Sequence, residues 1–184
     1  GGGGGCVGGG GWEGDYKTLG QLIGDIKQQN DHLAQTQFTE NFTVNTILQD
    51  AAYRAAQSDI RFDVLVSVPP QLTVAESDLC ELLMNMLDNA LEATAEVTDG
   101  KRFVRFQIET KNGFLAVKCE NSYSGKHRQD ADGNYLTTKN DAETHGFGLK
   151  LMNTVAVRYH SILDIFTSED RIFTVQTALK LPKK

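Results

Sequence analysis

The strongest pattern in this chain is an apolar stripe with helical spacing between residues 76 and 96. Its apolar positions recur every three or four residues, which places them on one face of an α-helix: Leu79, Leu82, Leu83, Met86, Leu87, Ala90 and Leu91. Asparagine is a poor helix former, because its amide competes for backbone hydrogen bonds. Two of them one turn apart, Asn85 and Asn89, therefore indicate that their side chains are used. A core helix with a solvated polar face is the alternative interpretation.

Similar spacing predicts three further helices. A narrow apolar stripe over residues 15–37 is typical of a helix that meets one neighbour or a second chain. A second helix is expected to begin with Thr43 as its N-cap and to end near Gln57. A third is expected from Gly148 to Tyr159. Before this third helix, residues 121–144 form a long polar segment. Such a segment is usually functional or mobile.

Alternating apolar and polar residues predict five strands. One covers residues 60–68 and stops at Pro69-Pro70. Residues 103–109 and 114–119 are expected to pair through a hairpin turn at 111–113, and residues 161–167 and 171–180 form the last pair. The simplest architecture is α+β, with helices packed on one face of a mixed sheet.

Composition narrows the class of protein. A chain of 184 residues fits one domain with some extra length, and its net charge of −6 argues against a nucleic-acid partner. No apolar run approaches the roughly 18 residues that span a bilayer. The three cysteines, Cys6, Cys80 and Cys119, form no CxxC pair, so buried free thiols in a reducing, cytoplasmic setting are expected. Residues 1–14 are glycine-rich and are interpreted as a disordered tail or an artefact of expression.

A second candidate feature lies sixty residues after the asparagines. Gly146 and Gly148 are expected where a loop becomes a helix, and glycine lets the backbone approach a ligand closely. The free N–H groups and the dipole of a first helical turn attract anions. If the two glycines stood alone, a close-packed turn would be the better explanation.

The two features together resemble the GHKL superfamily of ATP-binding domains. Residues 81–93 match its N box, residues 145–149 match its glycine box (HGxGL), and residues 136–139 resemble the Ser/Thr-Lys segment of its lid. The resemblance covers about residues 38–181 and implies a Bergerat-type two-layer α/β sandwich. The chain is most similar to sensor histidine kinases of Gram-positive peptide-sensing systems, which lack the DxGxG box and carry an asparagine there, here Asn121.

This resemblance implies a site for ATP and Mg²⁺. Asn89 would ligate the metal through its amide oxygen, and Asn85 would be the catalytic residue that faces the phosphates. Asn121 would accept a hydrogen bond from the adenine amino group, or else only cap a strand end. Lys139 would add a charge from the lid, unless it is simply solvated. The glycine box would contact the phosphates: His145, Gly146, Phe147, Gly148 and Leu149. The alternative for His145 is that it only shapes the turn.

One departure from the hydrolysing members of the superfamily bears on the reaction. In those members a glutamate four residues before the metal-binding asparagine activates water, and here that position is Asn85. An amide cannot act as the general base, so phosphotransfer to a protein side chain fits better than hydrolysis.

A histidine kinase also needs an acceptor histidine followed by an acidic residue. None of the four histidines, His32, His127, His145 and His160, has that context. The acceptor is therefore expected on a helix outside this sequence, in the same or a partner subunit, with a response regulator as the next partner.

The implied organisation is a tail (1–14), the end of a dimerisation helix (15–37) and a catalytic domain (38–184). The whole would be the cytoplasmic part of a homodimeric bacterial membrane receptor. Two alternatives stay open: a serine protein kinase of the anti-sigma type, and a degenerate module that dimerises or binds a partner without catalysis.

Overall fold

The computed structural model describes residues 21, 36–126, 128–129, 135–136 and 142–184. The chain divides into two compact units, Gly1–Thr36 and Gln37–Lys184, and almost everything described belongs to the second. The helix predicted over residues 15–37 lies outside the described residues apart from Gln21, Thr36 and Gln37. Within the described residues, none of the helices combines the length and the apolar character needed to cross a bilayer.

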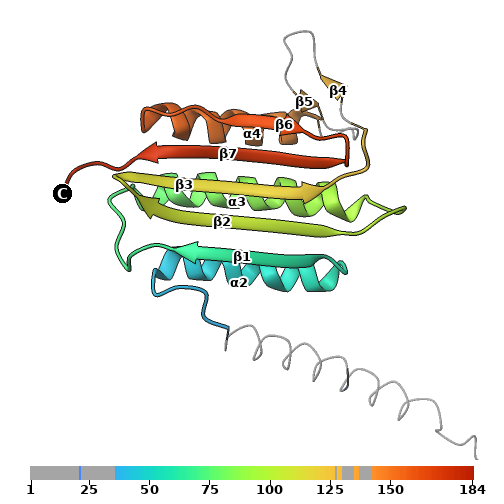
Figure 1. Cartoon of the computed structure of the whole chain (residues 1–184), viewed down its shortest axis with the longest axis horizontal. Helices are drawn as coiled ribbons and strands as arrows, with labels where there is room; N and C mark the ends of the chain where they lie inside the picture. Colours follow the sequence, from blue (N-terminus) through green and yellow to red (C-terminus); the bar gives the residue numbers. More distant parts are fainter. Residues whose placement is uncertain (1–20, 22–35, 127, 130–134, 137–141) are drawn as a thin grey trace, which may run out of the picture. The chain divides into compact units, whose positions relative to one another are not determined.

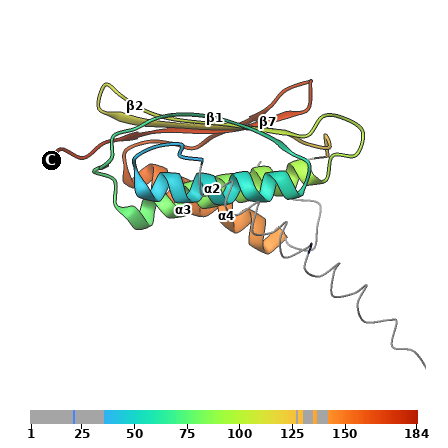
Figure 2. The ribbon, with the colours of Figure 1, turned by 90° about the horizontal axis from the view of Figure 1, so that it is seen from below.

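The second unit is an α+β sandwich of two layers, as the sequence predicts (Figures 1 and 2). Its main sheet has the strand order β1-β2-β3-β7-β6. The strands are β1 (Arg61–Ser67), β2 (Phe103–Lys111), β3 (Phe114–Ser122), β6 (Asp164–Thr167) and β7 (Ile172–Lys180). β1 pairs with β2 in parallel, and the other pairs are antiparallel, so the sheet is mixed. The three helices α2 (Phe42–Gln57), α3 (Glu76–Ala95) and α4 (Ala142–Arg158) cover one face (Figure 2).

Helix α3 is the element around which the core is built. Its apolar stripe is buried along its whole length, and Leu82, Leu83, Met86 and Leu87 are at most 1% exposed. It faces the buried side chains of β2 and β3, which alternate with exposed ones along each strand. This burial supplies the main stabilising free energy of the fold and fixes the direction in which the polar side of α3 points.

The ends of the helices are fixed by side chains that bind the backbone. Asn41 caps α2 by accepting from the Val44 N–H at 3.1 Å, so the predicted N-cap Thr43 is wrong by two residues. Thr43 instead donates its hydroxyl to the Glu76 carboxylate at the start of α3. Arg102 donates to three carbonyl groups at the ends of α2 and α3, at 2.8–2.9 Å: those of Ser58, Ala95 and Val97.

The loop between β2 and β3 is the hairpin turn that the sequence predicts. Asn112 and Gly113 both have positive φ, 52° and 81°, the conformation of a two-residue hairpin. β3 continues three residues beyond its predicted end at Cys119, which places Asn121 inside the strand. Cys119 is a buried free thiol, as predicted, and burial raises its pKa to about 12, so it stays protonated near neutral pH. Cys80 is half-buried and also free.

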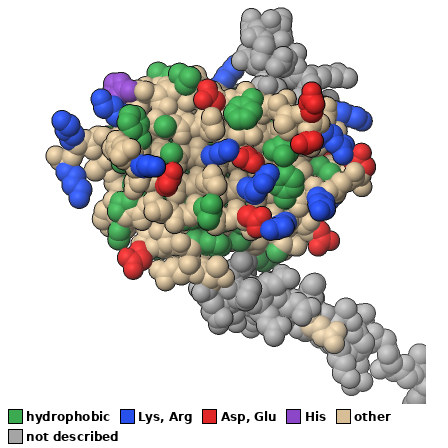
Figure 3. Space-filling view, viewed as in Figure 1, with side chains coloured by type: hydrophobic (Ala, Val, Ile, Leu, Met, Phe, Trp, Pro, Cys, Tyr) green, Lys and Arg blue, Asp and Glu red, His purple; other side chains and the backbone are tan. Residues whose placement is uncertain are grey.

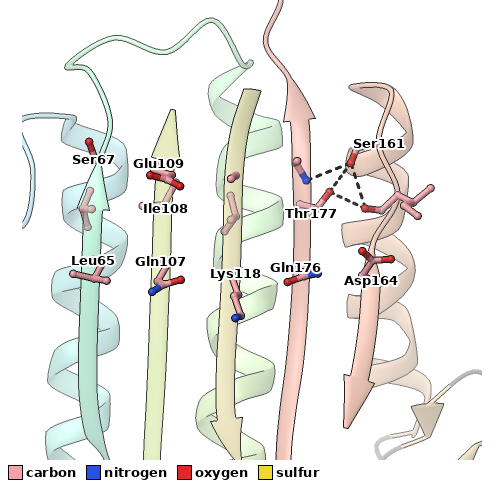
Figure 4. Close-up of a pocket in the computed structure, with 15 residues that line it drawn as sticks. Leu65, Ser67, Gln107, Ile108, Glu109, Lys118, Ser161, Asp164, Gln176 and Thr177 are labelled. Atoms are coloured by element: carbon pink, nitrogen blue, oxygen red, sulfur yellow. Dashed lines mark hydrogen bonds between the residues drawn. The ribbon is translucent and has the colours of Figure 1, made fainter. Parts of the chain in front are cut away.

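Among the helices of the described residues, none lies on the opposite face of the sheet. Lysine, arginine and acidic side chains are interspersed over this face, with apolar side chains between them (Figure 3). A hollow of about 690 Å³ crosses it, with Leu65 of β1 at one edge of the sheet and Asp164 of β6 at the other (Figure 4). None of the predicted site residues lines this hollow, so the predicted site and the hollow occupy different faces of the sheet.

Candidate functional site

The two asparagines of α3 meet α4 at Gly148. A Cβ atom added to Gly148 would lie 3.3 Å from Asn85 Oδ1, and 3.7 and 3.8 Å from the two amide atoms of Asn89. Asn85 Nδ2 donates to the Glu81 carbonyl at 2.7 Å, which leaves its amide oxygen directed toward α4. The N box and the glycine box, sixty residues apart in sequence, are therefore in contact.

Glycine at position 148 is what allows this contact. Gly148 is itself buried, and any larger side chain would occupy the space against the Asn85 and Asn89 amides. The two amides thus pack against Gly148 where α3 meets α4. An Mg²⁺ ion prefers oxygen ligands, and the amide oxygens at this position suit it. Among the described residues, no cluster of three or more His, Cys, Asp or Glu is placed to hold a metal.

Asn121 lies deeper, between the sheet and the helices. It is 2% exposed and stands on the helix-facing side of β3, two residues beyond the buried Cys119. Its Nδ2 donates to the Ser122 carbonyl at 2.9 Å. The same carbonyl accepts the Thr94 hydroxyl from the last turn of α3, also at 2.9 Å. The Asn121 amide is therefore oriented by the Ser122 carbonyl, which the end of α3 also binds, and its oxygen is left as the acceptor.

Thr94 was missed by the sequence reasoning, although a signal for it exists. It continues the apolar stripe of α3 three residues after Leu91, and it is fully buried. A hydroxyl on the buried face of a helix needs a hydrogen-bond partner. Here it bonds to the backbone of β3, which ties α3 to the strand that carries Asn121.

The glycine box does not begin its helix where the sequence predicts. α4 starts at Ala142, so Gly146 and Gly148 lie within the helix and the prediction of a start at Gly148 is wrong. The helix propensity of residues 142–145 outweighs the cost of the two glycines. The N–H groups of α4 that have no partner within the helix are those of its first turn, residues 142–145, because later N–H groups bond to the carbonyl four residues back.

The other predicted site residues differ in how far the structure describes them. Leu149 is half-buried and packs against the core. His145 and Phe147 belong to α4, but their side chains lie outside the described part of the chain. Lys139 lies outside the described residues altogether. Within the preceding polar segment, Arg128–Gln129 (β4) pairs with Tyr135–Leu136 (β5) in a separate two-stranded ribbon.

The close contact at Gly148 can be tested through stability. We expect Gly148→Leu to lower the free energy of unfolding by about 1–3 kcal/mol, because the added side chain has no room against the Asn85 amide. Lys150→Leu, at an exposed position of the same helix, is the control and should change it by less than about 0.5 kcal/mol. Urea unfolding followed by circular dichroism measures both. Equal unfolding midpoints for the two variants would contradict the close contact.

Comparison with known proteins identifies the family of this chain. Residues 74–180, more than half of the chain, match the family described as GHKL domain, and the chain belongs to that family of ATP-binding domains. No curated protein sequence matches the chain significantly.

Solved structures of histidine kinases share the fold. The nucleotide-free catalytic domain of histidine kinase ThkA is similar with a TM-score of 0.58 at 17% identity, covering 80% of this chain and 98% of that one. The histidine kinase AdeS of Acinetobacter baumannii is similar with a TM-score of 0.55 at 13% identity, covering 91% of this chain and 81% of that one. The mycobacterial sensor histidine kinase MprB gives 0.54 at 16% identity, covering 77% and 96%. At these identities the likeness shows the fold alone: this is a GHKL domain with the fold of histidine kinase catalytic domains.

Proposed function

We propose that this domain binds Mg·ATP between α3 and α4 and transfers the γ-phosphoryl group to a histidine on another helix. The observation that carries the proposal is the contact of Gly148 with Asn85 and Asn89. It places the amide oxygens of Asn85 and Asn89, the kind of ligand that Mg²⁺ accepts, beside α4 at Gly148.

The three asparagines would have different roles in this site. Asn89 would ligate the metal, and Asn85, one turn earlier, would face the phosphates with the amide oxygen that its bond to Glu81 leaves free. Asn121 would accept a hydrogen bond from the adenine amino group, with its amide oriented by the Ser122 carbonyl. The bound metal would neutralise charge on the phosphates, and the chain would contribute positioning.

The phosphates would meet the N-terminal end of α4. The unpaired N–H groups of its first turn and the positive end of its dipole suit an anion. Contact with the N–H groups of Gly146, Phe147 and Gly148 would require the first turns of α4 to open, because those groups lie inside the helix. The predicted role of Lys139 stays a prediction.

The choice of phosphoryl transfer over hydrolysis rests on Asn85. Its amide cannot take a proton from water, so the hydrolytic reaction lacks its general base. In the transfer proposed, a nitrogen of the acceptor imidazole forms the new bond to phosphorus as the bond from phosphorus to the departing ADP breaks. The acceptor helix, a response regulator and a homodimeric membrane receptor belong to this proposal, as does the division into a tail, a dimerisation helix and a catalytic domain.

Calorimetric titration with ATP in the presence and absence of Mg²⁺ tests the binding step. We expect saturable binding at ATP concentrations below about 1 mM, stronger with the metal than without it. The absence of heat at that concentration in both titrations would overturn the proposed function.

A second measurement identifies the acceptor chemistry. The chain is joined to a dimerisation hairpin that carries an acceptor histidine and is incubated with γ-labelled ATP. Phosphohistidine is lost in acid and kept in alkali, whereas phosphoserine is stable in acid. An acid-stable product would favour the serine-kinase alternative, and binding without any transfer would favour the non-catalytic module.

A further inference from the structure

A buried cluster of hydrogen bonds joins the start of α3 to the end of α4. Tyr159, directly after α4, donates its hydroxyl to Asp78 Oδ2 at 2.6 Å and accepts from the Ala75 N–H at 3.0 Å. Arg158 pairs with the other oxygen of Asp78. Asp78 and Tyr159 are only 7% and 8% exposed. We call Asp78, Arg158, Tyr159 and the Ala75 N–H the α3–α4 clamp.

The clamp also completes the N-terminus of α3. Ala75 is the N-cap residue of α3 and has no side-chain oxygen to offer. The N–H of Ala75 itself donates to the Tyr159 hydroxyl, 84 positions further along the chain. Burial and the bond to Asp78 raise the pKa of Tyr159, so the hydroxyl keeps the proton that it donates at neutral pH.

The end of α4 is fixed to the sheet as well. The Tyr159 carbonyl accepts from the Lys180 N–H at the end of β7, at 3.0 Å. The Ser161 N–H donates back to the Ala156 carbonyl at 2.9 Å, which closes the helix with His160 at positive φ. The C-terminal end of α4 is thus anchored on two sides, to α3 and to β7.

The clamp sets the axial register between α3 and α4. The two helices lie antiparallel, because the start of α3 meets the end of α4 and the Asn85 and Asn89 positions meet Gly148. Asp78 to Asn89 and Gly148 to Tyr159 cover the same number of residues, which corresponds to about 16.5 Å of helix on each side. A helix that slid or rotated at the clamp would carry Gly148 away from the two amides.

We propose that the Asp78–Tyr159 pair is a positioning element for the metal and phosphate end of the nucleotide site. It acts through α4, which it holds so that Gly148 closes on Asn85 and Asn89. This inference rests on the proposed function for its ligand, but the register that it assigns exists in the nucleotide-free protein. At the base end, the Asn121 amide and the Thr94 hydroxyl both donate to the Ser122 carbonyl, and neither bond involves the clamp residues.

The test compares Tyr159→Phe with Tyr53→Phe. Both substitutions remove one hydroxyl and keep the ring, but the Tyr53 hydroxyl accepts from Gln57 on the outer side of α2, away from the clamp. The first measurement is made without nucleotide: the NMR shifts of the Gly148 backbone amide and of the Asn85 and Asn89 side-chain amides. The second is the dissociation constant for Mg·ATP and for adenosine.

We expect Tyr159→Phe to shift or broaden the three amide signals. It should weaken Mg·ATP binding about tenfold, the size that one hydrogen bond to a charged group supports, and adenosine binding by less than about twofold. Tyr53→Phe should change neither. If the hydroxyl only stabilises the fold, its removal would leave the amide signals in place or would weaken the binding of both ligands equally. Either result would overturn the proposal. If the unmodified chain bound no nucleotide, the proposed function would fail, and the amide signals would still decide whether the clamp positions Gly148.

Discussion

Replacing Asn89 with alanine is expected to weaken Mg·ATP binding about 100-fold. Losing a group that only supports a metal ligand already weakens metal binding by about 10- to 100-fold, and Asn89 is proposed as a ligand itself. Asn89 is half-buried on α3, and its amide lies against Gly148, where α4 leaves no room for another side chain to take its place. Calorimetric titration at fixed Mg²⁺ measures the change. Asn153→Ala, at an exposed position of α4, removes the same amide from a helix and should bind as the unmodified chain does.

The metal dependence of this loss makes the assignment specific. If Asn89 acts through Mg²⁺, the difference between Asn89→Ala and the unmodified chain should disappear when the titration is repeated in a chelator. A loss of the same size with and without the metal would mean that Asn89 contacts the nucleotide directly. Unchanged binding of Mg·ATP would remove Asn89 from the site.

Local patterns predicted most of the fold because each element carries its own signal. The stripe of α3 and the alternation of β1, β2 and β7 all report which face is buried, and the structure confirms those elements to within a few residues. The boundaries failed where another interaction overrides the local signal. Thr43 is a suitable N-cap by type, but Asn41 takes that place, and its amide also donates to the Pro69 and Pro70 carbonyls.

The candidate site was predictable only where residue type alone reveals it. Asn85 and Asn89 stand out because asparagine is unfavourable in a helix, and the structure places them together with Gly148 as the combined motif suggested. The start of α4 was misplaced because glycine marks a helix end by propensity, whereas here Gly148 is needed inside the helix for close packing against α3.

The α3–α4 clamp could not be read from the sequence. Asp78 looks like an ordinary acidic residue in the first turn of a helix, where its carboxylate would interact favourably with the positive end of the helix dipole. Tyr159 looks like one more apolar position at the end of α4. Their bond joins residues 81 positions apart, and only the fold brings them together. Thr94 is similar, because its partner, the Ser122 carbonyl, leaves no mark on the sequence.

The largest loss of stability is expected from Phe106→Ala. Phe106 lies on the helix-facing side of β2 and is fully buried. Removing its ring would leave a cavity beneath α3 and should lower the free energy of unfolding by about 3–5 kcal/mol. Since a whole domain is stable by only about 5–15 kcal/mol, a substantial part of the molecules would unfold on mild heating. Phe42→Ala, at a phenylalanine that is 81% exposed, should cost less than about 0.5 kcal/mol. Urea unfolding followed by circular dichroism compares the two, and equal midpoints would contradict the placement of Phe106 in the core.

Mg·ATP should restore part of the stability that Phe106→Ala loses. A ligand that binds only the folded state stabilises it by about 2.7 kcal/mol when present at 100 times its dissociation constant. Phe106→Ala keeps Asn85, Asn89 and Gly148, so its unfolding midpoint should rise with Mg·ATP. Asn89→Ala, which keeps the core, should gain little at the same nucleotide concentration. Phe106→Ala would then be unstable but responsive to the nucleotide, and Asn89→Ala would be stable but unresponsive. This pair of results would separate the residues that stabilise the fold from those that bind the nucleotide. The same response in both variants would show that Asn89 is not part of the nucleotide site.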